Sequence, residues 1–111
     1  MKADIPFEDF QKLDLRVGKV IGAEAVAGSV NLLRLKVNLG NDHGVRNILS
    51  GIARWYKPGQ LEGKKFIFVT NLEAKKMMGM MSQGMILCAD YDHKAVIIPV
   101  NKKIPEGTII R

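Results

Sequence analysis

The chain has 111 residues, the size of one small domain, and its 47% apolar and 25% charged residues form an ordinary globular composition. No apolar run approaches the ~20 residues of a membrane helix, and the acidic start MKADIPFEDF does not resemble a signal peptide, so we expect a cytoplasmic protein. The single cysteine, Cys88, excludes an intramolecular disulfide, and we expect it to be a buried apolar residue.

The net charge is +6 and the sequence pI is about 9.6. The basic excess lies in the middle of the chain, where residues 29–79 hold nine Lys or Arg and three Asp or Glu. A local excess of this kind suits a polyanion ligand, because neutralised phosphates release counterions. A solvated basic surface explains the charge alone equally well.

The chain opens with a predicted short helix, in which Pro6 suits the first turn and Phe7, Phe10 and Gln11 share a face. A strand is predicted from Leu13 to Ala23. Its apolar alternation slips after Gly18, which predicts a β-bulge there.

The second predicted strand, Leu33 to Leu39, alternates apolar residues with the polar Arg34, Lys36 and Asn38. The turn sequence GNDHG at 40–44 then leads into a third strand, Val45 to Ser50, so these two strands are predicted to form a hairpin.

The rest of the chain continues as short elements joined by turns. They are a helix at Ile52–Tyr56, a fourth strand at Lys65–Leu72, a non-strand segment at Glu73–Gln83, a fifth strand at Gly84–Asp90, a turn at Asp92–Lys94, a strand at Ala95–Val100 and a tail at Thr108–Ile110.

This pattern predicts an all-β single domain over residues 1–111. The expected fold is the oligonucleotide-binding (OB) fold, a five-stranded Greek-key barrel, here with short helices and a C-terminal β extension. That fold binds ligands on its second and third strands and on the loops between strands one and two and strands four and five. Arg34 and Lys36 lie on the second strand, and Lys75 and Lys76 lie in the loop between strands four and five.

No enzyme motif is present, so we predict no catalytic residue, metal site or cofactor. His43 and His93 both fall in predicted turns and lack the spacing of metal ligands, which favours two solvated histidines. Ser29, Ser50 and Ser82 lie in no nucleophile motif, and no phosphate-binding glycine loop is found.

The segment Leu72–Met85, LEAKKMMGMMSQGM, holds five of the six methionines. These side chains could fill the mouth of the barrel or form an adaptable binding loop. In the second case Lys75 and Lys76 would meet phosphates, and Ser82 would hydrogen-bond to backbone or base. No aromatic residue lies on strands two or three, so a single-strand binder that stacks bases is disfavoured, and recognition of folded RNA by backbone and shape is favoured.

The sequence also resembles the tRNA-binding domain family, which occurs as dimeric tRNA-binding proteins, at the C-terminus of methionyl-tRNA synthetases and in a cytokine precursor of the animal synthetase complex. The resemblance spans nearly the whole chain. It is carried by FEDFQKLDLRVGKV at 7–20, LLRLKVNLG at 32–40, ILSGIARWYKPGQLEGKK at 48–65 and VTNLEAKKMMGMMSQGMIL at 69–87.

This resemblance implies a homodimer, with residues 1–14 as an N-terminal arm and residues 95–111 as a dimerisation extension. It implies binding of tRNA with little sequence preference, beside an aminoacyl-tRNA synthetase or as one of its modules. Val30-Asn31 stands where members of the family often have lysine. By position, the implied tRNA contacts are Arg34, Lys36, Arg46, Asn71, Lys75, Lys76, Ser82 and Met85.

A related branch, the CsaA export chaperones, shares the fold and leaves a second hypothesis open. In that reading the methionine-rich segment would bind unfolded peptides. The basic residues discriminate between the two hypotheses, since a peptide groove has no need of them.

Overall fold

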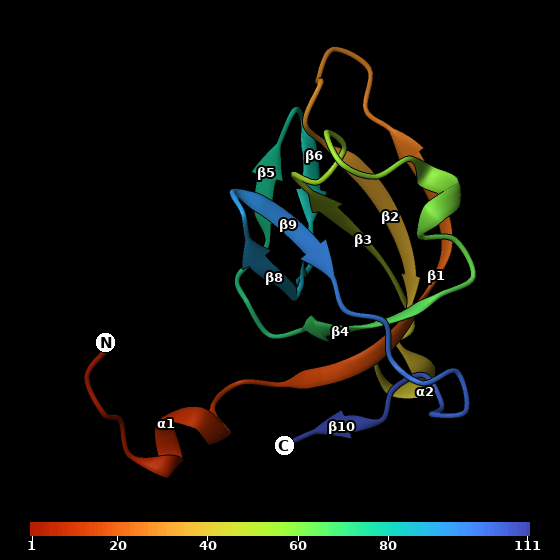
Figure 1. Cartoon of the computed structure of the whole chain (residues 1–111). Helices are drawn as coiled ribbons and strands as arrows, with labels where there is room; N and C mark the ends of the chain where they lie inside the picture. The colour runs from red at the N-terminus through yellow and green to blue at the C-terminus, as the bar shows by residue number, and fades with distance from the viewer.

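Five antiparallel strands curl into a nearly closed barrel in the computed structural model, which describes residues 1–111 (Figure 1). Their order in the sheet is β3-β2-β1-β4-β7, which confirms the predicted all-β, OB-like fold. The strands are β1 (Leu15–Ala25), β2 (Leu33–Asn38), β3 (Val45–Ser50), β4 (Lys65–Val69) and β7 (Met85–Ile86).

Hydrogen bonds between β3 and the residues just before β7 close the barrel. The amide of Gln83 donates to the carbonyl of Asn47 at 2.9 Å, and the amide of Leu49 donates to Oγ of Ser82 at 3.0 Å. The two edges of the sheet are therefore joined through a side chain as well as through the backbone.

The core consists of side chains that the strand alternation turns inward. Leu33, Leu35 and Val37 of β2 are at most 1% exposed, and Phe66 and Phe68 of β4 are fully buried. The outward residues of β2 are therefore the polar ones, as the sequence pattern predicts.

The predicted position of the β-bulge is wrong. The register of the pairing between β1 and β2 shifts between Val20 and Gly22, whereas Gly18 pairs regularly with Phe66 of β4. A Cβ at residue 18 would lie 2.8 Å from the ring of Phe68, so this glycine is explained by close packing.

The prediction that Glu73–Gln83 forms no strand is also wrong. β5 (Lys75–Met77) and β6 (Met80–Ser82) form an antiparallel hairpin. Met78 and Gly79 make its two-residue turn with φ values of 49° and 79°, as the tight turns of hairpins require. Methionine is uncommon at a positive φ, which explains why the sequence pattern concealed the turn.

The predicted strand Gly84–Asp90 divides at Leu87, whose amide donates to the carbonyl of Ile67 at 3.0 Å. Its first part is β7, and its second part pairs outside the barrel as β8 (Cys88–Tyr91) with β9 (Lys94–Ile97). β9 covers only part of the strand expected at Ala95–Val100. The turn between β8 and β9 lies at Asp92 and His93, as expected. Strand β4 ends at Val69, three residues before the predicted end at Leu72.

Helices are few and short. They are α1 (Phe7–Gln11), α2 (Gly40–His43) and the 3-10 helix η1 (Pro58–Gln60), and none has the length or apolar character to cross a bilayer. The helix predicted at Ile52–Tyr56 is a single turn, in which the amide of Tyr56 donates to the carbonyl of Ile52 at 3.1 Å. The amide of Ala53, which has no acceptor within that turn, donates to the carbonyl of Asn31 at 2.9 Å and ties the turn to the β1–β2 loop.

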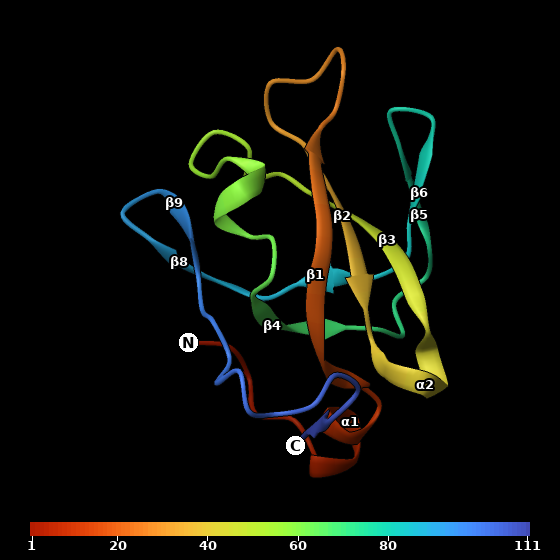
Figure 2. The same ribbon diagram turned by 90° about the vertical axis from the view of Figure 1, so that its right-hand side faces the viewer.

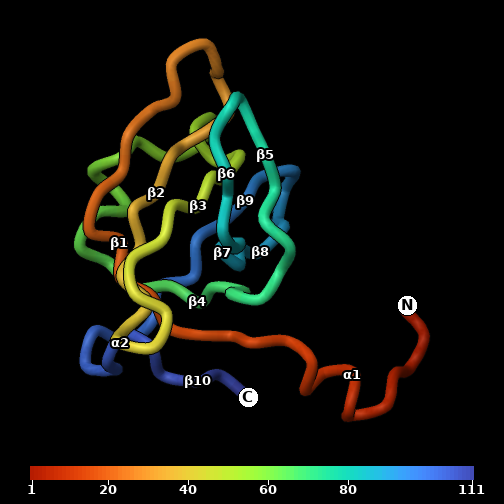
Figure 3. Tube along the Cα trace, turned by 180° about the vertical axis from the view of Figure 1, so that it is seen from behind, coloured from red at the N-terminus to blue at the C-terminus, as the bar shows by residue number.

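The N-terminal arm, residues 1–14, projects sideways from the barrel (Figure 3). The helix α1 in this arm has no buried residue. The last strand, β10 (Ile109–Ile110), pairs with Leu15 and Arg16 at the start of β1. The arm and the C-terminus therefore lie at the same end of the barrel (Figure 1).

Candidate nucleic-acid interface

Two basic side chains of β2 face away from the core. Arg34 and Lys36 alternate with the buried apolar residues of the strand, and Lys36 is exposed. Nη1 of Arg34 lies 3.3 Å from Oε1 of Glu24 on β1. Because the side chains of Arg34 and Glu24 are 43% and 64% exposed, the ion pair is weak, and the guanidinium can exchange the carboxylate for a phosphate at little cost.

The polar outer surface continues across the three neighbouring strands. Lys36 pairs with Gly22 of β1 on one side and with Asn47 of β3 on the other. The exposed amide of Asn47 was not among the predicted site residues. The outward alternation of β3 could have identified it, since Asn47 directly opposes Lys36.

Arg46 lies on the other face of the sheet from Arg34 and Lys36. It pairs directly with the buried Val37, so its side chain belongs to the inward set. Its Nη1 donates to the carbonyl of Thr70 at 2.7 Å, at the end of the barrel. Arg46, which the resemblance implies as a tRNA contact, therefore does not share the outer face with Arg34 and Lys36.

The β5–β6 hairpin stands beside β3 (Figure 2) and carries two exposed lysines without ion-pair partners. Lys75 is opposite Ser82, and Lys76 is opposite Met81, so the two ammonium groups lie on opposite faces of the hairpin. A surface groove joins β3 to this hairpin and is lined by Arg34, Asn47, Leu49, Met80, Met81 and Gln83. The outer surface of the sheet therefore continues onto the hairpin.

Ser82 and Met85 differ in what they can offer to a ligand. Ser82 is 5% exposed, and its hydroxyl accepts from the amide of Leu49 and donates to the carbonyl of Gly84 at 3.2 Å. Its only proton and one of its two acceptor lone pairs are used inside the protein, and the bond to Leu49 holds the hairpin on the barrel. Met85, by contrast, is 45% exposed.

Asn71 is exposed at the end of β4 and joins the N-terminal arm to the barrel. Its Oδ1 accepts from the amide of Asp14 at 2.8 Å, and its Nδ2 donates to the carbonyl of Lys12 at 2.6 Å. The carbonyl of Asp14 also accepts from the amide and the hydroxyl of Thr70. Asn71 thus fixes the direction in which the arm leaves the barrel.

The carboxylate of Asp14 binds two basic side chains from different parts of the chain. His43 Nε2 lies 2.8 Å from Oδ2, and Arg16 Nε lies 2.7 Å from Oδ1. Burial tends to raise the pKa of Asp14, but hydrogen bonds from Arg16 and His43 outweigh it and lower the pKa to about 2. The expectation of a solvated His43 is therefore wrong, since the imidazole is 17% exposed and joins α2 to Asp14, the residue just before β1.

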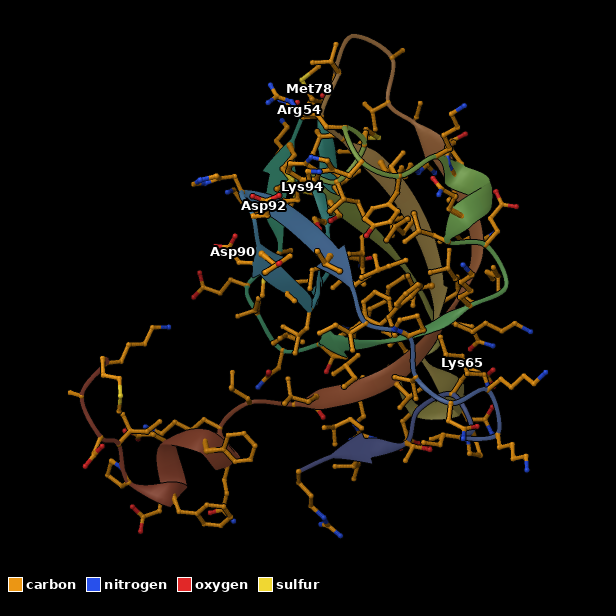
Figure 4. The ribbon with its side chains drawn as sticks, in the orientation of Figure 1. Arg54, Lys65, Met78, Asp90, Asp92 and Lys94 are labelled. Atoms are coloured by element: carbon orange, nitrogen blue, oxygen red, sulfur yellow. The ribbon has the colours of Figure 1, made fainter.

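Arg54 is a basic residue that sequence reasoning missed. Its Nε donates to Oδ1 of Asn31 at 2.7 Å, and Met78 lies close to Gly28 in the same β1–β2 loop. Figure 4 shows Arg54 and Met78 at the upper end of the barrel, opposite to Lys65. Asn31 of the β1–β2 loop therefore orients the guanidinium of Arg54.

The remaining candidates for chemistry have ordinary roles. Burial raises the pKa of the Cys88 thiol, which disfavours the reactive thiolate. No group of three His, Cys, Asp or Glu side chains is arranged to hold a metal ion.

Comparison with known proteins identifies the family. Residues 15–109 match the family model described as "Putative tRNA binding domain". The chain belongs to this tRNA-binding domain family. The methionine–tRNA ligase of Clostridium tetani is 46% identical over 112 residues, which are 99% of this chain and 17% of the ligase. The tRNA-binding domain thus spans about one-sixth of the length of the curated relatives it matches.

Two solved structures resemble the whole tRNA-binding domain. A protein of Pyrococcus horikoshii, described as related to methionyl-tRNA synthetase (MetRS), is 39% identical, with a TM-score of 0.94 and coverage of 99% of this chain and 100% of that one. The chaperone CsaA of Bacillus anthracis is 32% identical, with a TM-score of 0.87 and coverage of 98% and 100%. The fold is thus shared with both branches that the sequence resembles.

Proposed function

We propose that this domain binds folded tRNA through its phosphate backbone and overall shape. The observation that carries the proposal is the outward basic pair Arg34 and Lys36 on β2, which continues through a groove to the exposed lysines of the β5–β6 hairpin. Cationic side chains that reach phosphates give affinity without sequence readout. The absence of aromatic side chains on β2 and β3 disfavours stacking of a flexible single strand.

The eight predicted contact residues divide into two groups in this proposal. Arg34, Lys36, Lys75, Lys76 and Met85 present free or exchangeable surface to tRNA. Ser82, Asn71 and Arg46 hold the hairpin, the arm and the end of the barrel in place through internal hydrogen bonds. Substitution of a residue of the second group should therefore lower the stability of the fold, with a smaller effect on the tRNA affinity of the folded protein.

A homodimer is the second part of the proposal. The arm and the C-terminal strand expose a group of apolar side chains with no cover in the chain itself, and a five-residue helix without buried residues does not persist alone in water. They line a shared hollow and include Phe7, Phe10, Leu13 and Ile109. A second copy would bury these residues in an isologous contact.

The methionine–tRNA ligases that resemble this chain are much longer proteins, and the match covers 17% of the first of them. We infer that this domain supplies tRNA affinity to a methionyl-tRNA synthetase in the cytoplasm and catalyses nothing itself. The purified domain should then give no ATP–pyrophosphate exchange. Exchange by the purified domain would contradict the inference.

The central experiment is a filter-binding titration with total tRNA and with a single-stranded homopolymer at several salt concentrations. Lys36→Ala and Lys76→Ala should each weaken tRNA binding and reduce the log–log salt slope by about one. Lys103→Ala removes the same charge from an exposed position of the loop before β10, outside the groove and the hairpin, and serves as the matched control. Equal effects of all three substitutions would show that only net charge matters and would overturn the proposed interface.

Peptide binding is the alternative function, favoured by the exposed methionines Met78, Met81 and Met85 and by the structural likeness to CsaA. An unfolded peptide added to the same titration separates the two functions. If other RNA displaces bound tRNA and the peptide does not, the result supports the tRNA site. Peptide binding that survives Lys36→Ala and Lys76→Ala, without any tRNA binding by the parent, supports the chaperone.

A further inference from the structure

The strands β1, β2 and β3 run side by side in one sheet (Figure 2). A hollow lies on the outer face of this part of the sheet. Apart from Ala23, every residue of its lining is polar, charged or glycine. The side chains that matter for its chemistry come from three strands and the loop before β4, and they are Glu24, Arg34, Lys36, Asn47 and Glu62.

The floor of this hollow is Gly22, directly after the bulge in β1. A Cβ at this position would meet only Cβ of Lys36, at the ordinary contact distance of 3.7 Å, and Gly22 has no positive φ. The fold therefore does not require glycine at this position. What the missing side chain provides is space between Glu24 and Lys36.

The two carboxylates of the hollow are unexpected on a surface that binds phosphates, because they repel the ligand. Oε1 of Glu24 contacts Nη1 of Arg34 at 3.3 Å, and Glu62 has no ion-pair partner. Carboxylates become favourable beside RNA when they accept hydrogen bonds from the N–H groups of a base. The hollow thus combines acceptors from the glutamates with donors from Arg34, Lys36 and Asn47.

Guanine matches this combination better than the other three bases do. It carries the neighbouring donors N1–H and N2–H, which a single carboxylate accepts together, and the acceptors O6 and N7, which suit cationic donors. Adenine and cytosine place a lone pair beside their amino group, and uracil has one donor between two acceptors. A carboxylate facing those edges meets at least one repelling lone pair.

We propose that this hollow binds an unstacked guanine of the tRNA, with the carboxylate of Glu24 on its Watson–Crick edge and Arg34 or Lys36 on O6 and N7. The inference rests on the proposed tRNA binding. It adds a base-reading contact to an interface that otherwise reads phosphates and shape.

The test compares guanosine, inosine and adenosine 5′-monophosphates in NMR titrations of the full chain. All three carry the same phosphate, so the ratio of their affinities reports the base alone. Guanosine monophosphate should bind at least roughly fivefold more tightly than either of the other two nucleotides. Its binding should shift the backbone amide signals of Gly22, Glu24 and Asn47. Inosine lacks only the N2 amino group, so its weaker binding would locate the carboxylate at that edge.

Glu24→Gln separates two readings of this carboxylate, because they predict opposite changes in tRNA affinity. If the carboxylate merely repels phosphates, its loss should tighten tRNA binding; if it reads guanine, tRNA binding should weaken and the guanosine-to-inosine ratio should fall towards one. A displaced Arg34 would weaken guanosine and inosine monophosphates alike, because both carry O6 and N7, and would leave the ratio of their affinities unchanged. Tighter tRNA binding, or an unchanged ratio, would overturn the inference.

Gly22→Val fills the hollow and removes no charged group. Gly59→Val is its matched control, since no atom lies within 4 Å of a Cβ at residue 59. The first substitution should abolish the preference for guanosine monophosphate, and the second should preserve it. A parent chain that prefers guanosine monophosphate but does not bind tRNA refutes the proposed function alone. A parent that binds tRNA without a preference among the nucleotides refutes only the guanine site.

Discussion

Removal of the Ser82 hydroxyl tests whether this residue acts by holding the barrel closed. The hydroxyl accepts the amide hydrogen of Leu49 at 3.0 Å and donates to the carbonyl of Gly84 at 3.2 Å. Both Ser82 and Leu49 are 5% exposed, so water does not readily replace the lost partner in Ser82→Ala. The substitution therefore leaves a buried N–H group of β3 unpaired.

The expected loss of unfolding free energy is about 1–3 kcal/mol, the cost of one unsatisfied buried backbone donor. For a domain of this length, that loss corresponds to a fall in Tm of about 4–13 °C. The variant that remains folded at low temperature should bind tRNA with an unchanged salt slope, because no charge has been removed.

Urea denaturation at a fixed protein concentration measures the loss as a lower midpoint at an unchanged m-value. Ser29→Ala is the matched control, because its hydroxyl also accepts backbone amides, from Asn31 and Leu32, but in an exposed loop. That control should lose no more than about 1 kcal/mol. Equal midpoints for Ser82→Ala and the parent, together with weaker tRNA binding, would refute the structural role and place this hydroxyl in contact with tRNA.

Three further outcomes are expected. Because the pKa of Asp14 in the folded chain is lowered to about 2 from the ordinary 3.8, its carboxylate stabilises the fold above about pH 4, and this contribution is lost as the pH falls through 2. Asp14→Asn should remove about 1–2 kcal/mol at neutral pH and flatten the acid dependence of urea midpoints; an unchanged dependence would refute this. Gly84→Ala should lower the Tm strongly, since residue 84 has φ of 145° and its Cβ would lie 2.9 Å from the carbonyl oxygen of Val69, and a Tm equal to that of the parent would contradict the strain. Phe7→Ser combined with Phe10→Ser should shift sedimentation equilibrium from dimer to monomer, and a parent that sediments as a monomer would end the dimer proposal.

Much of the barrel could be predicted from local patterns. β2 and β3 were located to within one residue, because strict alternation around Leu33, Leu35 and Val37 distinguishes the core face from the solvent face. The same alternation correctly placed Arg34 and Lys36 on the outside of the barrel.

Other features depended on contacts between distant segments. The hairpin at Lys75–Ser82 was missed because Met78 occupies a positive-φ turn position that the pattern normally assigns to Asn, Asp or Gly. His43 was expected in solvent, yet it binds Asp14, a residue 29 positions earlier in the chain. No local pattern contains a partner at that separation.

The sequence by itself determined the family, the fold class and the strands whose alternation separates core from solvent, because burial of apolar side chains acts on every short window of the chain. Only the tertiary structure decided which polar residues are free to meet a ligand. Ser82, Asn71 and Arg46 look like ligand contacts in the sequence, but their polar atoms bind Leu49, Lys12 and Thr70 inside the chain. A polar side chain has the same appearance in a sequence whether its partner is internal or external, and the closure of the barrel brings the internal partners within reach.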